Sequence, residues 1–224
     1  MAQFLIADDH PLFREALGGA LSQMFDDLEI VQSDSLDTTL KQLEQYPELD
    51  LVLLDLHMPG SGDLYGLIRL REDYPTVPVA VISGSDSPEI ISKVMGFGAL
   101  GFIPKSASTD AIKEAVSAVI EGDKWVPETV RGKLASLSQE ERDLAAKVAT
   151  LTPQQYKVLY LLHTGLLNKQ IAYELGITEA TVKAHMTAIF RKLDVYSRIQ
   201  AVLLAEKLQL ESPQGADSTG ANSA

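Results

Sequence analysis

Residues 51–60 read LVLLDLHMPG, an apolar run that leads straight into Asp55 and stops at Pro59 and Gly60. A short apolar run bounded by a turn is typical of a strand buried on both faces, as in a parallel sheet. Asp55 then lies at the carboxyl end of that strand, the edge where open α/β sheets place their ligands. A single Asp before a turn is also a common turn residue, so the other strand ends decide between the two interpretations.

Four more apolar runs alternate with helical patterns in the first half of the chain. They occupy residues 4–7, 29–31, 77–83 and 99–105, and the second of them is weak. A helical repeat of apolar residues follows each predicted strand, beginning near residues 12, 36, 64, 88 and 108. Five such units predict an α/β fold, a doubly wound five-stranded parallel sheet with helices on both faces.

Polar residues stand at four of these strand ends, namely Asp8 with Asp9, Asp55, Ser83 and Lys105. Because the carboxyl ends of parallel strands meet at one edge, we expect these side chains to cluster. Clustered carboxylates form a hard-oxygen site suited to Mg²⁺, and a carboxylate can act as a nucleophile toward phosphorus. A lysine and a hydroxyl supply the charge and the donor that a transferred phosphoryl group needs. Each residue alone has a purely structural explanation, but their convergence favours a phosphoryl site.

The composition narrows the class of protein. No cysteine is present, so disulfides, thiolate metal sites and cysteine nucleophiles are excluded. No apolar run approaches the ~20 residues that span a bilayer, and no leader segment is visible at the N-terminus, so we expect a soluble cytoplasmic protein without a membrane partner. The net charge of -12 is uneven: residues 1–122 carry 20 acidic and 7 basic residues, whereas residues 151–210 carry 4 and 7. The two halves therefore suggest different partners, and the second is compatible with nucleic acid.

Residues 1–122 resemble the receiver domain of two-component response regulators, a flavodoxin-like fold, over their whole length. The resemblance implies that Asp55 is the phosphoacceptor and that a sensor histidine kinase is the phosphodonor. It also implies that Mg²⁺ is the cofactor, bound directly by Asp9, by Asp55 and by the main-chain carbonyl of His57, with Asp8 assisting. The side chains of His10 and His57 are not needed for this chemistry.

The same resemblance assigns the switch residues. Lys105 would pair with the phosphoryl oxygens. Ser83 fills the hydroxyl position of the family, where Thr is also common. Phe102 fills the aromatic switch position, where Tyr is frequent in the family. Because Phe cannot donate a hydrogen bond, its inward state would depend on packing alone.

The second half predicts a set of short helices. Thr152 and Pro153 begin one helix, residues 168–175 form another, Gly176 breaks the chain, and Thr178 caps a helix over residues 179–193. Two short helices joined by a turn with glycine form a helix-turn-helix, whose second helix enters the major groove of DNA. Helix count alone would equally allow a plain helical bundle, so the order of residues has to decide.

That order resembles the LuxR-type helix-turn-helix from about residue 150 to 208. The motifs are LTP at 151–153, NKQIA at 168–172, LGI at 175–177, TVKAH at 181–185, RKL at 191–193 and RIQA at 198–201. With the receiver in front, the chain resembles the NarL/FixJ class of bacterial response regulators, in which a receiver is followed by a small all-α DNA-binding domain.

The resemblance implies which residues contact double-stranded DNA. Lys183, Ala184 and Thr187 would face the base edges. Residues nearer the phosphates would be Lys169, Thr178, Thr181, His185 and Arg191. Other family members often carry a long basic residue where Thr187 stands, which leaves the operator sequence open.

We expect four segments: a receiver at 1–122, a linker with one short helix at 123–150, the helix-turn-helix domain at 151–210, and a disordered tail at 211–224. Trp125 in the linker is a packing residue or, as the alternative, a binding residue. The final helix carries an apolar strip, Ile199, Val202 and Leu203, where the family forms its homodimer. In this family the unphosphorylated receiver often covers the DNA-binding surface, so phosphorylation would shift the chain toward an open dimer; RNA polymerase is a further candidate partner.

Two alternatives remain open at this stage. An aspartate-based phosphatase of the haloacid-dehalogenase type also uses Asp, Ser or Thr, Lys and Mg²⁺, although its nucleophile usually lies on the first strand in an Asp-x-Asp pattern. A regulator that works through protein contacts without phosphorylation is the other. We expect the protein to accept a phosphoryl group on Asp55 and to catalyse its own dephosphorylation. We expect no other enzymatic activity. The kinase, its signal, the operator and the sign of regulation stay open, and so does whether the unphosphorylated form is closed or already dimeric.

Overall fold

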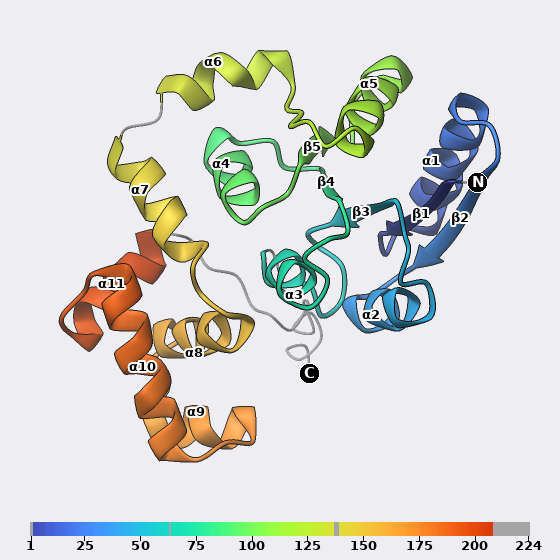
Figure 1. Cartoon of the computed structure of the whole chain (residues 1–224). Helices are drawn as coiled ribbons and strands as arrows, with labels where there is room; N and C mark the ends of the chain where they lie inside the picture. Colours follow the sequence, from blue (N-terminus) through green and yellow to red (C-terminus); the bar gives the residue numbers. More distant parts are fainter. Residues whose placement is uncertain (1, 63, 137–138, 208–224) are drawn as a thin grey trace, which may run out of the picture.

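The computed structural model describes residues 2–62, 64–136 and 139–207, which form five strands and eleven helices (Figure 1). The strands are β1 Ala2–Ala7, β2 Leu28–Ser33, β3 Leu51–Asp55, β4 Val79–Ser83 and β5 Gly101–Pro104. The helices that alternate with them are α1 Pro11–Met24, α2 Leu36–Gln45, α3 Tyr65–Asp73, α4 Pro88–Gly96 and α5 Thr109–Ile120. Six more follow: α6 Glu128–Ser136, α7 Gln139–Val148, α8 Pro153–His163, α9 Asn168–Leu175, α10 Glu179–Leu193 and α11 Arg198–Lys207. The predicted tail at 211–224 lies outside the described residues.

The five strands form one parallel sheet in the order β2-β1-β3-β4-β5. This confirms the predicted doubly wound fold, including the second strand, which is weak by sequence but pairs with β1 along its whole length. The register aligns the carboxyl ends of the strands, since Asp55 pairs with Ile82 and Ser83 pairs with Pro104. The sheet therefore carries its polar strand ends to one common edge.

Successive strand residues point to opposite faces of the sheet, and each face has its own core. On one face, α1 and α5 cover the side chains of Phe4, Ile6, Leu51 and Leu53. On the other face, α2, α3 and α4 cover alternate strand residues, and this core does not end at the receiver. The second core continues through Val148, Leu151 and Tyr156 into α8 and α10.

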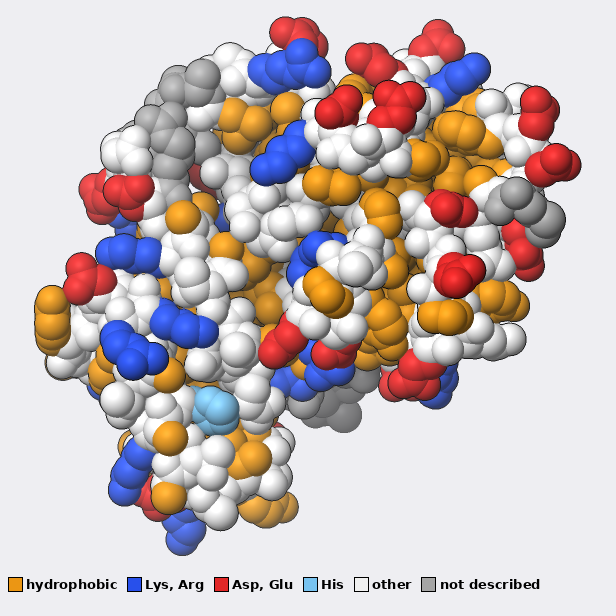
Figure 2. Space-filling model, viewed as in Figure 1, with side chains coloured by type: hydrophobic (Ala, Val, Ile, Leu, Met, Phe, Trp, Pro, Cys, Tyr) orange, Lys and Arg blue, Asp and Glu red, His pale blue; other side chains and the backbone are white. Residues whose placement is uncertain are grey.

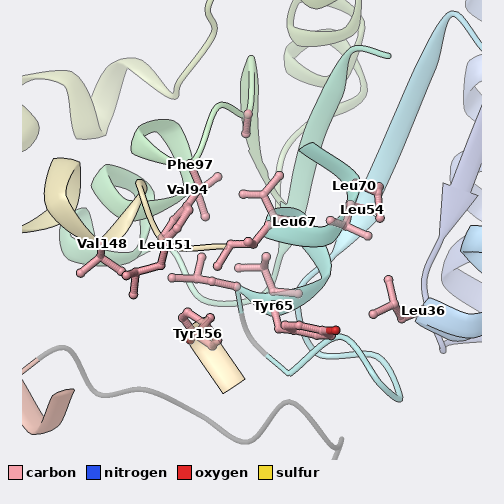
Figure 3. Close-up of a cluster of buried hydrophobic side chains, with 14 of the residues drawn as sticks. Leu36, Leu54, Tyr65, Leu67, Leu70, Val94, Phe97, Val148, Leu151 and Tyr156 are labelled. Atoms are coloured by element: carbon pink, nitrogen blue, oxygen red, sulfur yellow. The ribbon is translucent and has the colours of Figure 1, made fainter. Parts of the chain in front are cut away.

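Figure 3 shows this continuous cluster, with Val148 and Leu151 beside Val94 and Phe97 of the receiver. Helix α4 contacts both α6 and α7, and α3 contacts α8. The ammonium of Lys157 on α8 also lies 4.5 Å from the ring centre of Tyr65 on α3, a cation–π contact. The two halves of the chain are thus joined through a shared apolar interface.

The segment at 123–150 differs from its sequence-based prediction, because it holds two helices and is packed. The sequence did not predict helix α6 because this segment contains Gly132 and lacks a strong apolar stripe. The helix is stabilised instead by its packing against α4, and its Val130 side chain is buried. Trp125 is a packing residue: its amide donates to Leu100 and its carbonyl accepts from Phe102, at 2.9 and 3.0 Å.

The helix-turn-helix follows the predicted boundaries closely. Thr152 and Gln155 form a reciprocal capping box at the start of α8, and Thr178 caps α10 by accepting from the amide of Thr181 at 3.1 Å. Gly176 ends α9 at φ 64°, a left-handed conformation that glycine adopts without strain. Across the described ranges, no helix combines the length and the apolarity needed to cross a membrane.

The close packing of β5 gives a stability prediction. A Cβ atom added at Gly101 would lie 2.8 Å from Val119 Cγ2, so Gly101→Ala is expected to lower the free energy of unfolding by about 1–3 kcal/mol, the usual cost of overpacking. A Cβ atom added at Gly19 in α1 would have no neighbouring atom within 4 Å, so Gly19→Ala should raise the free energy of unfolding by ~0.5–1 kcal/mol. Urea unfolding measures both, and equal effects of the two substitutions would contradict the packing at Gly101.

Candidate functional site

The polar strand ends form an open cleft at the carboxyl edge of the sheet. Asp8 and Asp9 follow β1, Asp55 is the last residue of β3, and Lys105 follows β5. The cleft has a volume of about 490 Å³. Its lining residues are His10, Leu12, Phe13, Asp55, His57, Gly84 and Lys105.

The carboxylates are close together and mostly buried. Asp8 and Asp55 are 2% and 1% exposed, whereas a third of the Asp9 side chain reaches solvent. One carboxylate oxygen from each of the three residues, together with a ring nitrogen of His10, lies within 4.8 Å of the others. Asp55 Oδ1 is buried and has no hydrogen-bond partner within the described part of the chain. A hard divalent cation such as Mg²⁺ fits this donor set, because it would neutralise the carboxylates and fill that open position.

Lys105 is the cation that the structure places in the carboxylate cluster. Its Nζ lies 2.7 Å from Asp8 Oδ2 and 3.1 Å from Asp55 Oδ2, and 4.9 Å above the ring of Phe13. Burial works against the charged amine, but the hydrogen bond with Asp8 and the charge of Asp55 outweigh it and raise the pKa of Lys105. Lys105 therefore stays charged and in contact with the acceptor oxygen of Asp55.

The Asp55 carboxylate is a negative charge buried away from water. Burial raises the pKa of this carboxyl, Lys105 opposes the shift, and the neighbouring charge of Asp8 adds to it. A buried carboxylate beside like charges has fewer water molecules around it to compete with an electrophile. The site thus combines an activated carboxylate with a fixed cation, the arrangement expected for attack on phosphorus.

Three other predicted residues surround this pair less directly. Ser83 is fully buried, and its hydroxyl accepts a hydrogen bond from the amide of Ser85 at 3.2 Å, but it is not one of the described residues that line the cleft. Phe102 is also fully buried, in the core shared with α4, which agrees with an inward position that depends on packing. His57 is exposed at the rim of the cleft.

Two residues contribute to the site without a role in the sequence-based prediction. His10 was placed near the site but given no role, and its Nδ1 lies 2.7 Å from Asp9 Oδ1 and 3.1 Å from Asp8 Oδ1. Phe13 contributes an aromatic face to Lys105. Pro11 at the first helical position gave a usable signal, because a helix that begins directly after Asp8 and Asp9 must direct its first turn over the same edge.

The second candidate surface is the outer face of α9 and α10. Of the eight residues predicted to contact DNA, six are exposed, and Thr181 and His185 are half-buried. The inner face of α10 holds Val182, Ile189 and Leu193 in the core. Figure 2 shows several Lys and Arg side chains over the part of the surface formed by α7 to α11, whereas Asp and Glu side chains are spread over the receiver. An exposed helix with basic neighbours suits insertion into the major groove.

In the conformation described, the receiver does not cover this surface. Lys183, Ala184 and Thr187 are all exposed, and α9 to α11 extend away from the sheet (Figure 1). The physical reason is that the receiver packs against α7 and α8, which carry the apolar residues of the interface. The strip on α11 is also accessible, with Ile199 and Leu203 72% and 58% exposed and Val202 half-buried.

Two family models match the chain, one on each half. Residues 4–117 match the response regulator receiver domain, and residues 149–205 match the bacterial regulatory proteins of the luxR family. The glycerol metabolism activator of Pseudomonas putida is 40% identical over 210 residues, which cover 92% of this chain and 95% of that protein. The nitrate/nitrite response regulator protein NarL of Escherichia coli K12 is 32% identical over 203 residues, covering 90% and 94%.

Solved structures agree with these matches. RcsB of Salmonella enterica serovar Typhimurium, bound to promoter DNA in the presence of phosphomimetic BeF3-, is 25% identical with a TM-score of 0.55, covering 91% of this chain and 97% of that one. Both halves of the chain, their order and the connected fold are therefore accounted for by one family. The chain belongs to the NarL/FixJ class of two-component response regulators, with a receiver domain followed by a LuxR-type DNA-binding domain.

Proposed function

We propose that this response regulator is a transcription factor switched by phosphorylation of Asp55. The observation that supports this most directly is the contact of Lys105 with Asp55 Oδ2 at 3.1 Å. It lies in a receiver whose apolar core continues into the DNA-binding domain. A sensor histidine kinase would supply the phosphoryl group, acting in the cytoplasm where the chromosome is accessible.

The transfer needs a nucleophile and compensation of charge. A carboxylate oxygen of Asp55 attacks phosphorus as the bond from phosphorus to the donor's imidazole nitrogen breaks, and that nitrogen leaves with the electron pair. Lys105 pairs with the oxygens of the transferred group, and Ser83 and Phe102 adjust to the new charge. Water can later cleave the aspartyl-phosphate in the same cleft, which returns the regulator to its resting state.

Mg²⁺ is the proposed cofactor. Asp8, Asp9, Asp55 and the main-chain carbonyl of His57 would hold it, consistent with the cluster of carboxylate oxygens within 4.8 Å. When bound, it supplies positive charge to the phosphoryl oxygens as they approach the carboxylates. Asp8 and Asp9 thus bind and orient, while Asp55 reacts.

The proposed target is double-stranded DNA with paired half-sites. Lys183, Ala184 and Thr187 would face bases, and Lys169, Thr178, Thr181, His185 and Arg191 would lie nearer the phosphates. One helix-turn-helix offers few contacts, so two copies on half-sites about 34–36 Å apart bind more tightly. The strip Ile199, Val202 and Leu203 on α11 would form the homodimer. The activator name of the Pseudomonas putida relative suggests that RNA polymerase is a further partner.

Binding to genomic DNA fragments tests the proposed function. The full chain is incubated with fragments in Mg²⁺, with and without a small phosphodonor such as acetyl phosphate, and the bound DNA is sequenced. We expect a limited set of fragments that share paired half-sites and are retained more strongly with the phosphodonor. Equal retention of all fragments under both conditions would overturn the proposal.

Two lysines are expected to affect DNA binding differently. Lys183→Ala removes a base contact and should weaken specific binding by ~1–3 kcal/mol with little effect on random DNA. Lys169→Ala removes a phosphate contact and should weaken binding to both, with a flatter dependence on salt. Titrations of a selected and a random duplex at several salt concentrations separate the two. Parallel losses for both variants would mean that α10 is not the base-reading helix.

A further inference from the structure

We propose that the base-facing surface of α10 reads thymine methyl groups, with the methyl group of Thr187 as a specificity-determining contact. This inference rests on the proposed DNA-binding function and assigns the chemistry of the bases that the helix recognises. It follows from the hydrogen-bonding state of the exposed side chains on α10.

The two polar side chains of this surface, Lys183 and Thr187, differ in how their polar groups are held. The ammonium of Lys183 lies 3.1 Å from Glu179 Oε1, one turn earlier, but both side chains are well exposed, so this ion pair is weak and Lys183 can exchange it for a base. The hydroxyl of Thr187 donates to the main-chain carbonyl of Lys183 at 3.0 Å. Such bonds from Ser or Thr to the carbonyl four residues earlier are common in helices and occupy the only hydroxyl proton.

Apart from Lys183, this surface therefore presents apolar groups to the groove. With its hydroxyl directed at the helix backbone, exposed Thr187 presents its methyl group, and exposed Ala184 lies one turn away on the same side. In the major groove, the C5 methyl group of thymine is the one apolar feature among the base edges, and Ala and Thr methyl groups are its usual partners. A long basic side chain at position 187 would instead select hydrogen-bond acceptors.

Replacement of thymine by deoxyuridine tests the inference, because it deletes that methyl group and leaves base pairing unchanged. The probe is a duplex selected from a random library by the full-length chain in Mg²⁺ and acetyl phosphate, with each thymine replaced in turn. Burial of one methyl group corresponds to about a fourfold change in a binding constant, so at least one replacement per half-site should weaken binding by about that factor.

Two variants identify the group responsible. Thr187→Ser keeps the hydroxyl and deletes the methyl group, and it should bind the thymine and deoxyuridine duplexes equally at that position. Thr187→Val keeps a methyl group, deletes the hydroxyl and should retain the discrimination. The inference is overturned if Thr187→Ser discriminates as the wild type does, if Thr187→Val does not, or if no replacement weakens wild-type binding. Failure of the library to yield any preferred sequence would overturn the proposed function as well, and so the two failures are distinguishable.

Discussion

Asp55→Asn is expected to abolish acceptance of a phosphoryl group by the full chain. The amide has nearly the shape of the carboxylate but is not a nucleophile toward phosphorus, so the reaction loses its acceptor atom. Because the substitution also removes a buried charge beside Asp8, we expect the fold to be retained. Intact-mass measurement after incubation with acetyl phosphate and Mg²⁺ shows whether the phosphoryl group is gained.

Asp86→Asn provides the matched control, since Asp86 is an exposed carboxylate in the loop after β4 and should be dispensable for labelling. Circular dichroism and thermal unfolding establish that the Asp55→Asn variant is folded. Full labelling of that variant would show that another carboxylate, Asp8 or Asp9, accepts the phosphoryl group, and the assignment of Asp55 would be wrong.

The pKa of Asp55 adds a pH dependence to this prediction. A protonated carboxyl is not nucleophilic, and burial raises the pKa of Asp55, so without a divalent cation this carboxyl should become protonated at a higher pH than an ordinary exposed carboxylate. NMR of the Asp55 carboxyl carbon during a pH titration measures this. Lys105 lowers the pKa of Asp55, and Lys105→Met should therefore move the protonation step to higher pH. A step at the same pH in both proteins would mean that Lys105 does not act on Asp55.

The receiver fold and the reactive cluster could be predicted because each depends on local patterns. Four of the five apolar runs end in a polar residue, and a parallel sheet brings such ends to one edge whatever the details of packing. Asp8, Asp55 and Lys105 therefore meet in the structure as the spacing predicts, at 2.7 and 3.1 Å from the lysine nitrogen. The helix-turn-helix could be predicted in the same way, since Thr152, Gly176 and Thr178 mark the ends of its helices.

The interface between the two halves could not be predicted in this way. Leu151 and Tyr156 look like ordinary core residues of the second domain, yet they belong to the same buried cluster as Val94 and Phe97 of the receiver. An amphipathic pattern states that a residue is buried but not by which partner. The same limit explains why α6 was missed and why the sequence leaves open whether the receiver covers the base-facing residues of α10.

This interface leads to the second large expected effect, which uses an engineered disulfide between α4 and α7. A Cβ atom at Gly96 would lie 3.9 Å from the Cβ of Ala145, within the ~3.5–4.5 Å that a disulfide spans. The chain has no other cysteine, so Gly96→Cys with Ala145→Cys gives a single defined crosslink. Oxidation should hold the linker helix against the receiver, and reduction should release it in the same sample.

We expect the crosslinked protein to lose the response of DNA binding to phosphorylation while keeping each separate activity. Asp55 lies in a cleft away from the crosslink and should still be labelled. The base-facing residues of α10 are exposed in the docked form, so binding to a single half-site should be unchanged. Binding to paired half-sites should no longer increase with acetyl phosphate, because two docked receivers hold their DNA-binding domains in one fixed orientation.

The comparison between oxidised and reduced samples separates two ways in which the regulator could switch. If the reduced protein responds and the oxidised one does not, phosphorylation acts by loosening the contacts of α4 with α6 and α7, and the population shifts toward forms able to pair on DNA. The single variants Gly96→Cys and Ala145→Cys control for the substitutions themselves. An oxidised protein that responds fully would mean that the α4–α7 contact persists in the active form. The switch would then depend on pairing of receivers rather than on their release from the DNA-binding domain.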